Sequence, residues 1–320
     1  MTSAANTGGV GPLPLDLAIR LAAFRFLERL ARFHGEALPY QALAAGFEFE
    51  GVRVPLLGPQ GIFKPQVMEL PLSIMTSPPS ASRPRPYDDG FEADGLIRYR
   101  YRGTDVQHRD NIGLREAMRR GTPLVYLHGL CKGKYKAVWP VVVVGDDPAS
   151  LSFMISAEDH VHVLARLESG DMTDADPGAD LRRRYASREA HQRLHQAAFR
   201  ERVLHAYRER CSVCRLQHPE LLDAAHIIPD REETGEPVVS NGLSLCKLHH
   251  AAFDKNLMGI RPDYVVQVRQ DVLDETDGPM LLHGLQGMHG RELVLPSRRI
   301  WYPDKERVEE RYEAFKHAAA

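Results

Sequence analysis

Apolar residues recur at helical spacing near the start of the chain and at strand spacing further along it. Residues 13–34 carry Leu and Phe at helical spacing, and Gly35 follows as a stop signal. Residues 40–49 predict a second short helix that runs into a strand, and the segment after them predicts a hairpin or wing. We interpret residues 1–76 as a helical N-terminal extension, which is either a small winged unit or a cap on the next domain.

A series of short segments with strand patterning follows a Pro/Ser-rich crossing at residues 77–86. Residues 96–103 alternate apolar or aromatic residues with Arg, as a half-buried strand does, and residues 111–120 predict one short helix. Three further strands are predicted, at residues 123–129, 135–145 and 151–156. Strands around a single short helix predict a small, strongly curved β-barrel that spans residues 77–167.

The rest of the chain returns to helical and mixed patterning. Residues 168–210 predict an acidic, turn-rich linker followed by a long helix. The buried positions expected on that helix include Leu194, Ala198, Val203 and Tyr207. Residues 211–320 form the last predicted domain, which ends in an amphipathic helix behind Pro303. The fold class expected for the whole chain is therefore α+β.

The composition of the chain indicates where the protein is located and whether it contacts a membrane. The chain has 320 residues, of which 43% are hydrophobic and 26% charged, as in a globular protein of two or three domains. It has no apolar run long enough to span a bilayer and no signal-peptide layout at its start. We therefore expect a cytoplasmic protein without a membrane partner.

The charge distribution is uneven. The net charge is only −2, but residues 181–210 hold nine Arg against three Glu. A basic stripe of this kind suits a polyanion better than the overall charge suggests. The residues expected to contact a DNA backbone are Arg182, Arg183, Arg184 and Arg188. The alternative is an ordinary polar helix face.

Three of the four cysteines lie close together in the last domain, which indicates metal binding rather than disulfides. Cys211 and Cys214 form one pair with two residues between them, and Cys246 and His249 form a second pair with the same spacing. Two such pairs can hold one tetrahedral structural Zn²⁺. In this set His249 is the least certain member, because the neighbouring His250 could replace it.

Residues 211–256 resemble the HNH nuclease family. They combine the Cys-x-x-Cys pair with Ala-His-Ile-Ile-Pro at 225–229, Asn241 in a loop, and a His-His pair on the next predicted helix. The resemblance implies a zinc-stapled ββα-metal fold that binds one catalytic divalent metal, Mg²⁺ or Mn²⁺, at the scissile phosphate of DNA. It further implies that His226 is the general base, that Asn241 orients it, and that His250 binds the catalytic metal.

One position departs from the family pattern. Many members carry Asp directly before the first His, where it binds the metal, but here that position is Ala225. Asp223 shares a strand face with Ala225, and Asp254 shares a helix face with His250, so either carboxylate could replace the missing ligand. A metal held by His250, phosphate and water remains a third possibility.

The segment 87–159 is similar to PUA-like domains, and within them to SRA domains. The resemblance rests on YDDGFEADGLIRYRYRGTD at 87–105, NIGLREAMRRGTPLVYLHG at 111–129 and YKAVWPVVVV at 135–144. It implies a reader that flips a modified base into a pocket. Candidate residues for that pocket are Tyr99, Tyr101, Asp105, Tyr135 and Trp139. Aromatic residues of a β-barrel are also common core residues, which is the competing interpretation.

These observations together predict a modified-base reader joined by a helix to an HNH nuclease. The expected substrate is double-stranded DNA with modified cytosines, and cutting both strands with one site per chain indicates a homodimer. Two alternatives stay open. The first is a homing, mobile-element or repair nuclease without modification dependence, and the second is a zinc-dependent DNA-binding module without catalysis.

Overall fold

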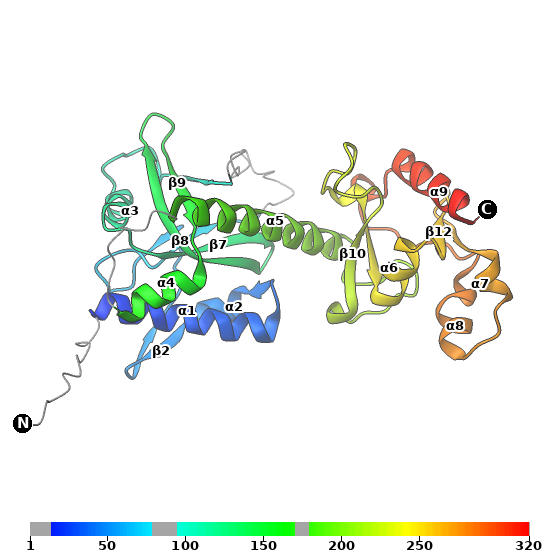
Figure 1. The fold of residues 1–320 in the computed structure, drawn as a ribbon, viewed down its shortest axis with the longest axis horizontal. Coiled ribbons are helices and arrows are strands. Elements are labelled where there is room, and N and C mark those ends of the chain that lie inside the picture. The colour runs from blue at the N-terminus through cyan, green and yellow to red at the C-terminus, as the bar shows by residue number, and fades with distance from the viewer. Residues whose placement is uncertain (1–13, 79–94, 170–178, 320) are drawn as a thin grey trace, which may run out of the picture. The chain divides into compact units, whose positions relative to one another are not determined.

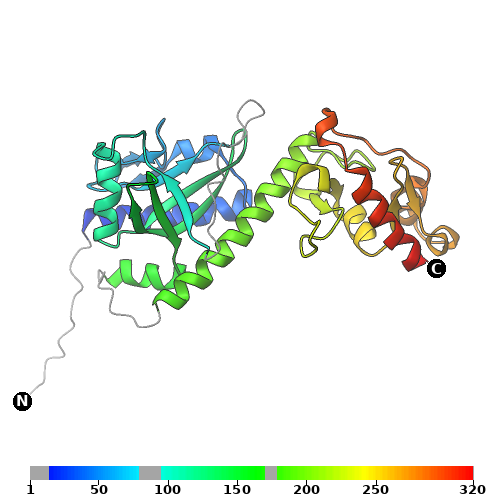
Figure 2. The ribbon, with the colours of Figure 1, turned by 90° about the horizontal axis from the view of Figure 1, so that it is seen from above.

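The computed structural model describes residues 14–78, 95–169 and 179–319. The chain divides into two compact units, Met1–Leu194 and His195–Ala320. The boundary falls inside α5 (Ala179–Ala206), a single continuous helix that is visible in Figure 2. Among the described residues, no helix is both long and apolar enough to cross a membrane.

The N-terminal unit is built on a seven-stranded, curled sheet that forms a half-barrel. Its main path runs β4 (Ile62–Phe63), β5 (Ser73–Thr76), β7 (Leu124–Cys131), β8 (Lys134–Asp147), β9 (Ser152–Ala157) and β6 (Ile97–Arg100), and β1 (Leu38–Pro39) pairs with β8. All these neighbours are antiparallel except β5 and β7, which are parallel. The long strands β7 and β8 therefore form the centre of the sheet.

Hydrophobic cores cover both faces of this sheet, because side chains along a strand alternate between its faces. On β7, Val125 and Leu127 join a core with α1 (Leu15–His34) and α4 (His160–Ser169), which lie side by side in Figure 1. Leu124 and Tyr126 join the opposite core with α3 (Arg109–Arg119). The first core also takes in α2 (Tyr40–Ala45) and the hairpin of β2 (Phe47–Phe49) and β3 (Val52–Val54).

The sequence predicted most of these elements, and the mixed α+β class is confirmed. Two features differ from the expectation. The segment 1–76, which we set apart as an extension, contributes β1, β4 and β5 to the same sheet as β7 and β8. Helix α4 was not predicted, because its short pattern follows an acidic segment and only packing against α1 shows its buried face. The pairing of β1 with β8 and of β5 with β7 joins segments far apart in the chain, and such pairing leaves no local sequence signal.

The C-terminal unit begins with the second half of α5 and continues into a ββα arrangement (Figure 1). Strands β10 (Leu222–His226) and β11 (Gly242–Cys246) pair antiparallel, and α6 (Lys247–Asp254) follows directly. The remaining elements are β12 (Met258–Ile260), β13 (Val266–Val268), α7 (Gln270–Asp274), α8 (Pro279–Gly284) and α9 (Lys305–Ala319). One hydrophobic core joins these elements to α5, so this half of the helix belongs to the unit.

Candidate functional site

The four residues expected to hold zinc lie together in the C-terminal unit. The ligand atoms of Cys211, Cys214, Cys246 and His249 are all within 4.8 Å of one another. The sulfurs of Cys214 and Cys246 are 3.9 Å apart, close to the edge of about 3.8 Å that a tetrahedron with ordinary Zn–S bonds requires. Nδ1 of His249 lies 3.1 Å from the Cys246 sulfur and 3.5 Å from the Cys211 sulfur. The donor set therefore fits a tetrahedral Zn²⁺.

The other nitrogen of His249 is also held. Its Nε2 donates a hydrogen bond of 2.7 Å to the carbonyl oxygen of Gly284, at the end of α8. This bond leaves Nδ1 for a metal, because it fixes the proton on the far side of the ring. Burial opposes a charge on this ring, but the sulfurs of Cys211 and Cys246 attract a proton to Nδ1 and raise the pKa of His249 to about 10, and a Zn²⁺ at the cluster would take the place of that proton. The sulfurs thus make the cluster attractive to a cation.

Asn241 fixes the loop that joins the two strands of the hairpin. Its side-chain oxygen accepts a hydrogen bond from the backbone N–H of Ile228 at 2.9 Å. Its side-chain nitrogen donates to the carbonyl oxygens of Ile228 and Glu236, both at 3.0 Å. Asn241 is completely buried, so these three bonds satisfy its amide inside the protein. This residue acts on the chain around His226 rather than on the solvent side of the site.

His226 is the last residue of β10 and is half-buried. Its ring stacks on Phe199 of α5, with ring centroids 3.9 Å apart and planes 14° apart. Nε2 is buried and has no hydrogen-bond partner among the described residues. Burial lowers the pKa of His226, and the nearby His250 lowers it further, while Asp230 and Asp254 act in the opposite direction. A histidine with a lowered pKa is neutral at neutral pH, which is the form that accepts a proton.

Both carboxylates proposed to replace the missing metal ligand lie next to His250. Nδ1 of His250 is 3.6 Å from the carboxylate of Asp223, and Nε2 is 3.4 Å from the carboxylate of Asp254. The hydrogen bond to Asp223 raises the pKa of His250, although burial opposes this. Imidazole and carboxylate groups form a donor set that suits a divalent cation with open positions for water. The structure therefore brings the three residues together without choosing between the two carboxylates.

Two basic residues that the sequence analysis did not single out surround Asp223. Lys247 Nζ lies 2.7 Å from one carboxylate oxygen, and Arg200 Nε lies 3.6 Å from the other. Burial raises the pKa of Asp223, but hydrogen bonds from His250 and Lys247 outweigh it and hold the pKa well below its usual range. Arg200 also donates to the carbonyl oxygens of Pro219 and Leu222. Arg200 lies on α5, so its position beside the start of β10 could have been found only from the fold.

In the N-terminal unit, the aromatic candidates for a base pocket do not gather in one place. Tyr99 and Tyr101 are buried in the core that contains α3. The hydroxyl of Tyr99 donates to the carbonyl oxygen of Met75, and that of Tyr101 donates to Asp146. Asp105 is exposed and accepts a hydrogen bond from the backbone N–H of Gln107. Part of the motif that suggested this pocket, residues 87–94, lies outside the described residues.

Tyr135 and Trp139 lie instead on the opposite core, and Trp139 lines a cavity of about 640 Å³. Nε1 of Trp139 is buried without a hydrogen-bond acceptor among the described residues. His160 packs edge-on against its ring at 6.1 Å. Tyr185, which is 67% exposed, also lines the cavity. The sequence did not show that Trp139 and Tyr185 line the same cavity.

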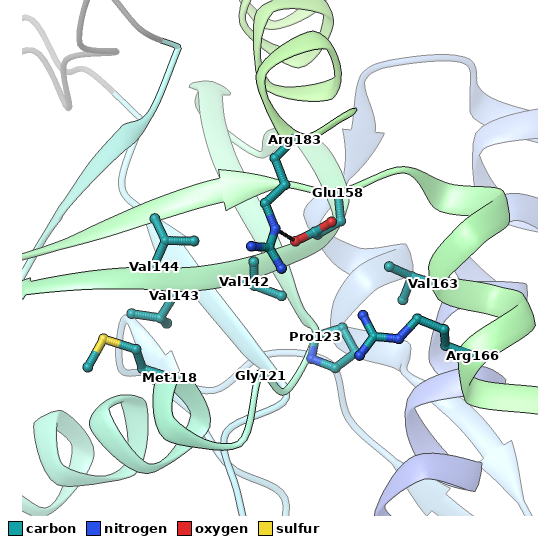
Figure 3. Close-up of a pocket in the computed structure, with 10 residues that line it drawn as sticks. All are labelled: Met118, Gly121, Pro123, Val142, Val143, Val144, Glu158, Val163, Arg166 and Arg183. Carbon is teal, nitrogen blue, oxygen red and sulfur yellow. Dashed lines mark hydrogen bonds and ion pairs between the residues drawn. The ribbon is translucent and has the colours of Figure 1, made fainter. Parts of the chain in front are cut away.

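The four arginines expected at a DNA backbone have different surroundings. Arg184 and Arg188 are exposed, and Arg182 lines the cavity beside Trp139. Arg183 forms an ion pair with the buried Glu158 in a second cavity of about 210 Å³ (Figure 3). The same view shows that Val142, Val143 and Val144 also line this cavity. Arg183 therefore joins α5 to the residue that follows β9, whereas Arg184 and Arg188 are exposed to solvent.

Comparison with known proteins identifies the C-terminal site. Residues 211–261 match the family model described as HNH endonuclease. Among solved structures, the chain is similar to a "Modification dependent TagI restriction endonuclease", with 18% sequence identity, coverage of 77% of this chain and 81% of that one, and a TM-score of 0.29. No curated protein matches the chain. Residues 211–261 therefore form an HNH endonuclease domain, which makes this chain a DNA endonuclease.

Proposed function

We propose that the chain is a metal-dependent restriction endonuclease that hydrolyses phosphodiester bonds in DNA with modified cytosines. The observation that carries the catalytic part is the half-buried His226 at the end of β10, whose ring stacks on Phe199 and whose pKa is lowered by burial. In this proposal His226 removes the proton from the attacking water, which needs a neutral imidazole near its working pH. Asn241 keeps the backbone around that imidazole in place through its three hydrogen bonds.

His250 would hold the catalytic Mg²⁺ or Mn²⁺, together with Asp223 or Asp254. A divalent ion at this place neutralises charge that develops on the phosphate and on the leaving oxygen. Lys247 is 59% exposed and lies beside the same residues, so it would attract the phosphate as the DNA enters. Zn²⁺ at the Cys₃His cluster would have a structural role, because four protein ligands leave no position open for substrate.

The modification-dependent part of the proposal is supported by the cavity beside Trp139. A volume of about 640 Å³ lies within the range of roughly 300–1,000 Å³ typical of small-ligand sites. An aromatic wall can stack a flipped base. We therefore propose that the base pocket of the expected PUA/SRA-like reader lies at Trp139 and Tyr185 rather than at the hydrogen-bonded Tyr99 and Tyr101.

The test is digestion of otherwise identical duplexes that carry cytosine, 5-methylcytosine, 5-hydroxymethylcytosine or N6-methyladenine, with Mg²⁺ and with Mn²⁺. We expect cleavage of at least one cytosine-modified duplex and little cleavage of plain DNA. Equal cleavage of all four would favour a nuclease without modification dependence. Binding without any cleavage in either metal would favour a zinc-dependent DNA-binding module.

A pair of variants tests the pocket itself. Tyr185→Ala removes an exposed aromatic ring from the cavity wall and should reduce the preference for modified DNA about tenfold, since stacking contributes roughly 1–3 kcal/mol per base. Phe33→Ala removes an aromatic ring that is 84% exposed elsewhere on the same unit and should leave the preference unchanged. An equal effect of both changes, or no effect of Tyr185→Ala, would contradict the pocket assignment.

A further inference from the structure

The ring of Phe199 covers one face of the proposed general base. Phe199 is 2% exposed and belongs to the half of α5 that lies in the C-terminal unit. Its ring lies nearly parallel to that of His226, with centroids 3.9 Å apart. At this separation the two rings are in van der Waals contact, so no water fits between them. The stack leaves His226 with one face toward α5 and the other toward the rest of the site.

The backbone across from His226 is shaped to admit this ring. His226 pairs directly with Gly242 in the hairpin. A Cβ atom at Gly242 would come within 3.0 and 3.1 Å of two ring carbons of Phe199, and within 2.4 Å of Cγ2 of Val203. The approach to Val203 is closer than real Cβ contacts and the approaches to Phe199 are tighter than most of them, so glycine at this position lets α5 pack closely on the hairpin. The Asn-Gly sequence thus has two roles, since Asn241 fixes the loop and Gly242 makes room for Phe199.

The charged groups that act on His226 come from the segment after β10 and from α6. Asp230 follows the strand, and His250 and Asp254 come from α6. On α5, Arg200 pairs with the buried Glu201 and with Asp223, and it also donates to backbone carbonyl oxygens. Arg202 donates to the carbonyl oxygens of Ala198 and Pro237. The group that α5 places against the imidazole is therefore the uncharged ring of Phe199.

We propose that Phe199 is a positioning residue of the nuclease centre, which holds the His226 imidazole in one orientation and keeps water from one of its faces. The inference rests on the proposed role of His226 as general base. A fixed, partly dehydrated imidazole disfavours the imidazolium form, because burial penalises the charge. The lowered pKa of His226 agrees with this environment. A misplaced general base slows the chemical step much more than it weakens DNA binding.

The experiment compares Phe199→Leu with Val203→Ala in the zinc-loaded full-length protein. Leu keeps an apolar side chain but removes the ring, whereas Val203→Ala weakens the same helix–hairpin contact without touching the stack. For Phe199→Leu we expect the single-turnover cleavage rate to fall about 10- to 100-fold with unchanged DNA affinity and zinc content. The acid limb of its pH–rate profile should also move to higher pH. Val203→Ala should keep the wild-type acid limb.

Two further measurements keep the inference testable if a variant is unstable or a substrate is not cut. Gly242→Ala should push both Val203 and the ring of Phe199 away from the hairpin without deleting either side chain, and should cause the same shift of the acid limb. An NMR titration of His226 in the full-length protein should show a higher pKa in Phe199→Leu than in the wild type, whether or not the DNA tested is cleaved. If wild-type protein cut none of the duplexes, the proposed substrate would be wrong, and this titration alone would decide the role of Phe199. An unchanged titration, or an equal acid-limb shift in Val203→Ala, would overturn it.

Discussion

Arg20 is a charged side chain with no exposed surface at all, on the buried face of α1. Its guanidinium pairs with Asp16 at 2.6 Å and donates to the carbonyl oxygens of Pro71 and Pro123, both at 2.9 Å. Burial lowers its pKa, while Asp16 supports the charged form. One side chain therefore joins α1 to two distant loops of the N-terminal unit.

Replacing Arg20 should be costly for stability. Arg20→Met leaves the buried carbonyl oxygens of Pro71 and Pro123 without the donor that Arg20 supplies and removes the ion pair with Asp16, so we expect the free energy of unfolding to fall by about 3 kcal/mol. Arg25→Met is the matched control, because Arg25 lies on the same helix and forms an exposed pair with Glu168. Its effect should stay within about 0.5 kcal/mol. Denaturant unfolding of both variants measures the difference, and equal effects would refute the role of Arg20.

His226→Ala should abolish cleavage while DNA binding and zinc content stay normal, since a general base contributes to the transition state alone. His205→Ala, which removes an exposed histidine of α5, should have no such effect. In the wild type, cleavage should lose rate only as pH falls through the lowered pKa of His226, because the imidazole is neutral above it. The rate should thus be level at neutral pH. Near-normal nicking by His226→Ala would place the base elsewhere.

The two carboxylates beside His250 can be separated by their effect on the metal requirement. Removing a true ligand with Asp223→Asn or Asp254→Asn should raise the Mg²⁺ concentration needed for half-maximal cleavage about tenfold or more. Asp254 is 57% exposed and Asp223 is 29% exposed, so neither change should unfold the unit. Metal titrations of both variants identify the ligand. If neither titration changes, His250 holds the metal with phosphate and water only.

At the level of elements, the Cys₃His cluster connects the segment after α5 to the β11–α6 corner and, through His249, to α8. Small modules of this kind take much of their folding energy from the metal. Cys246→Ser should therefore lose zinc and abolish the unfolding transition of the C-terminal unit, but not that of the N-terminal unit. Cys131→Ser, in the other unit, should keep both zinc and transition. Metal analysis and thermal unfolding check this, and a well-folded wild type without zinc would contradict it.

The sequence predicted those elements whose signals are local. Helical spacing predicted α1, α3 and α9, and alternation or apolar runs predicted β6 to β9. The pairs of β5 with β7 and of β1 with β8 join segments far apart in the chain, and no local pattern specifies such partners. The place of segment 1–76 in the sheet was therefore not foreseen.

The site divides in the same way. Cysteine spacing brought together the four zinc residues, and the motif order brought together His226, Asn241 and His250 in one hairpin and helix. Phe199 was missed, although it lies at helical spacing from the expected core position Val203, because apolar spacing cannot distinguish a core ring from one stacked on a histidine. The burial of Tyr99 and Tyr101 could not be read from the sequence for a related reason. Alternation placed Tyr99 and Tyr101 on one face, but only the structure shows that this face is core.

At the scale of the whole molecule, each chain has a single HNH domain and therefore a single cutting centre. Cutting both strands needs two such centres, so we predict that two chains act together. At low protein concentration, supercoiled plasmid should accumulate in the nicked form, and the linear form should appear with a steeper than first-order dependence on protein. Adding a His226→Ala chain to wild type should yield nicked product. Linearisation that remains first-order at the lowest concentrations would contradict a dimer.

The amide of Asn241 has a further consequence for the lifetime of the protein. An asparagine followed by glycine is prone to deamidation, because the glycine nitrogen can attack the side-chain carbon to form a succinimide. In the folded chain the Asn241 amide is held by three hydrogen bonds and the Gly242 N–H by the carbonyl oxygen of Val239. Once zinc is lost and this unit opens, the restraint ends. Loss of the metal, which is reversible at first, would then lead to irreversible deamidation of Asn241 and so to permanent damage of the nuclease site.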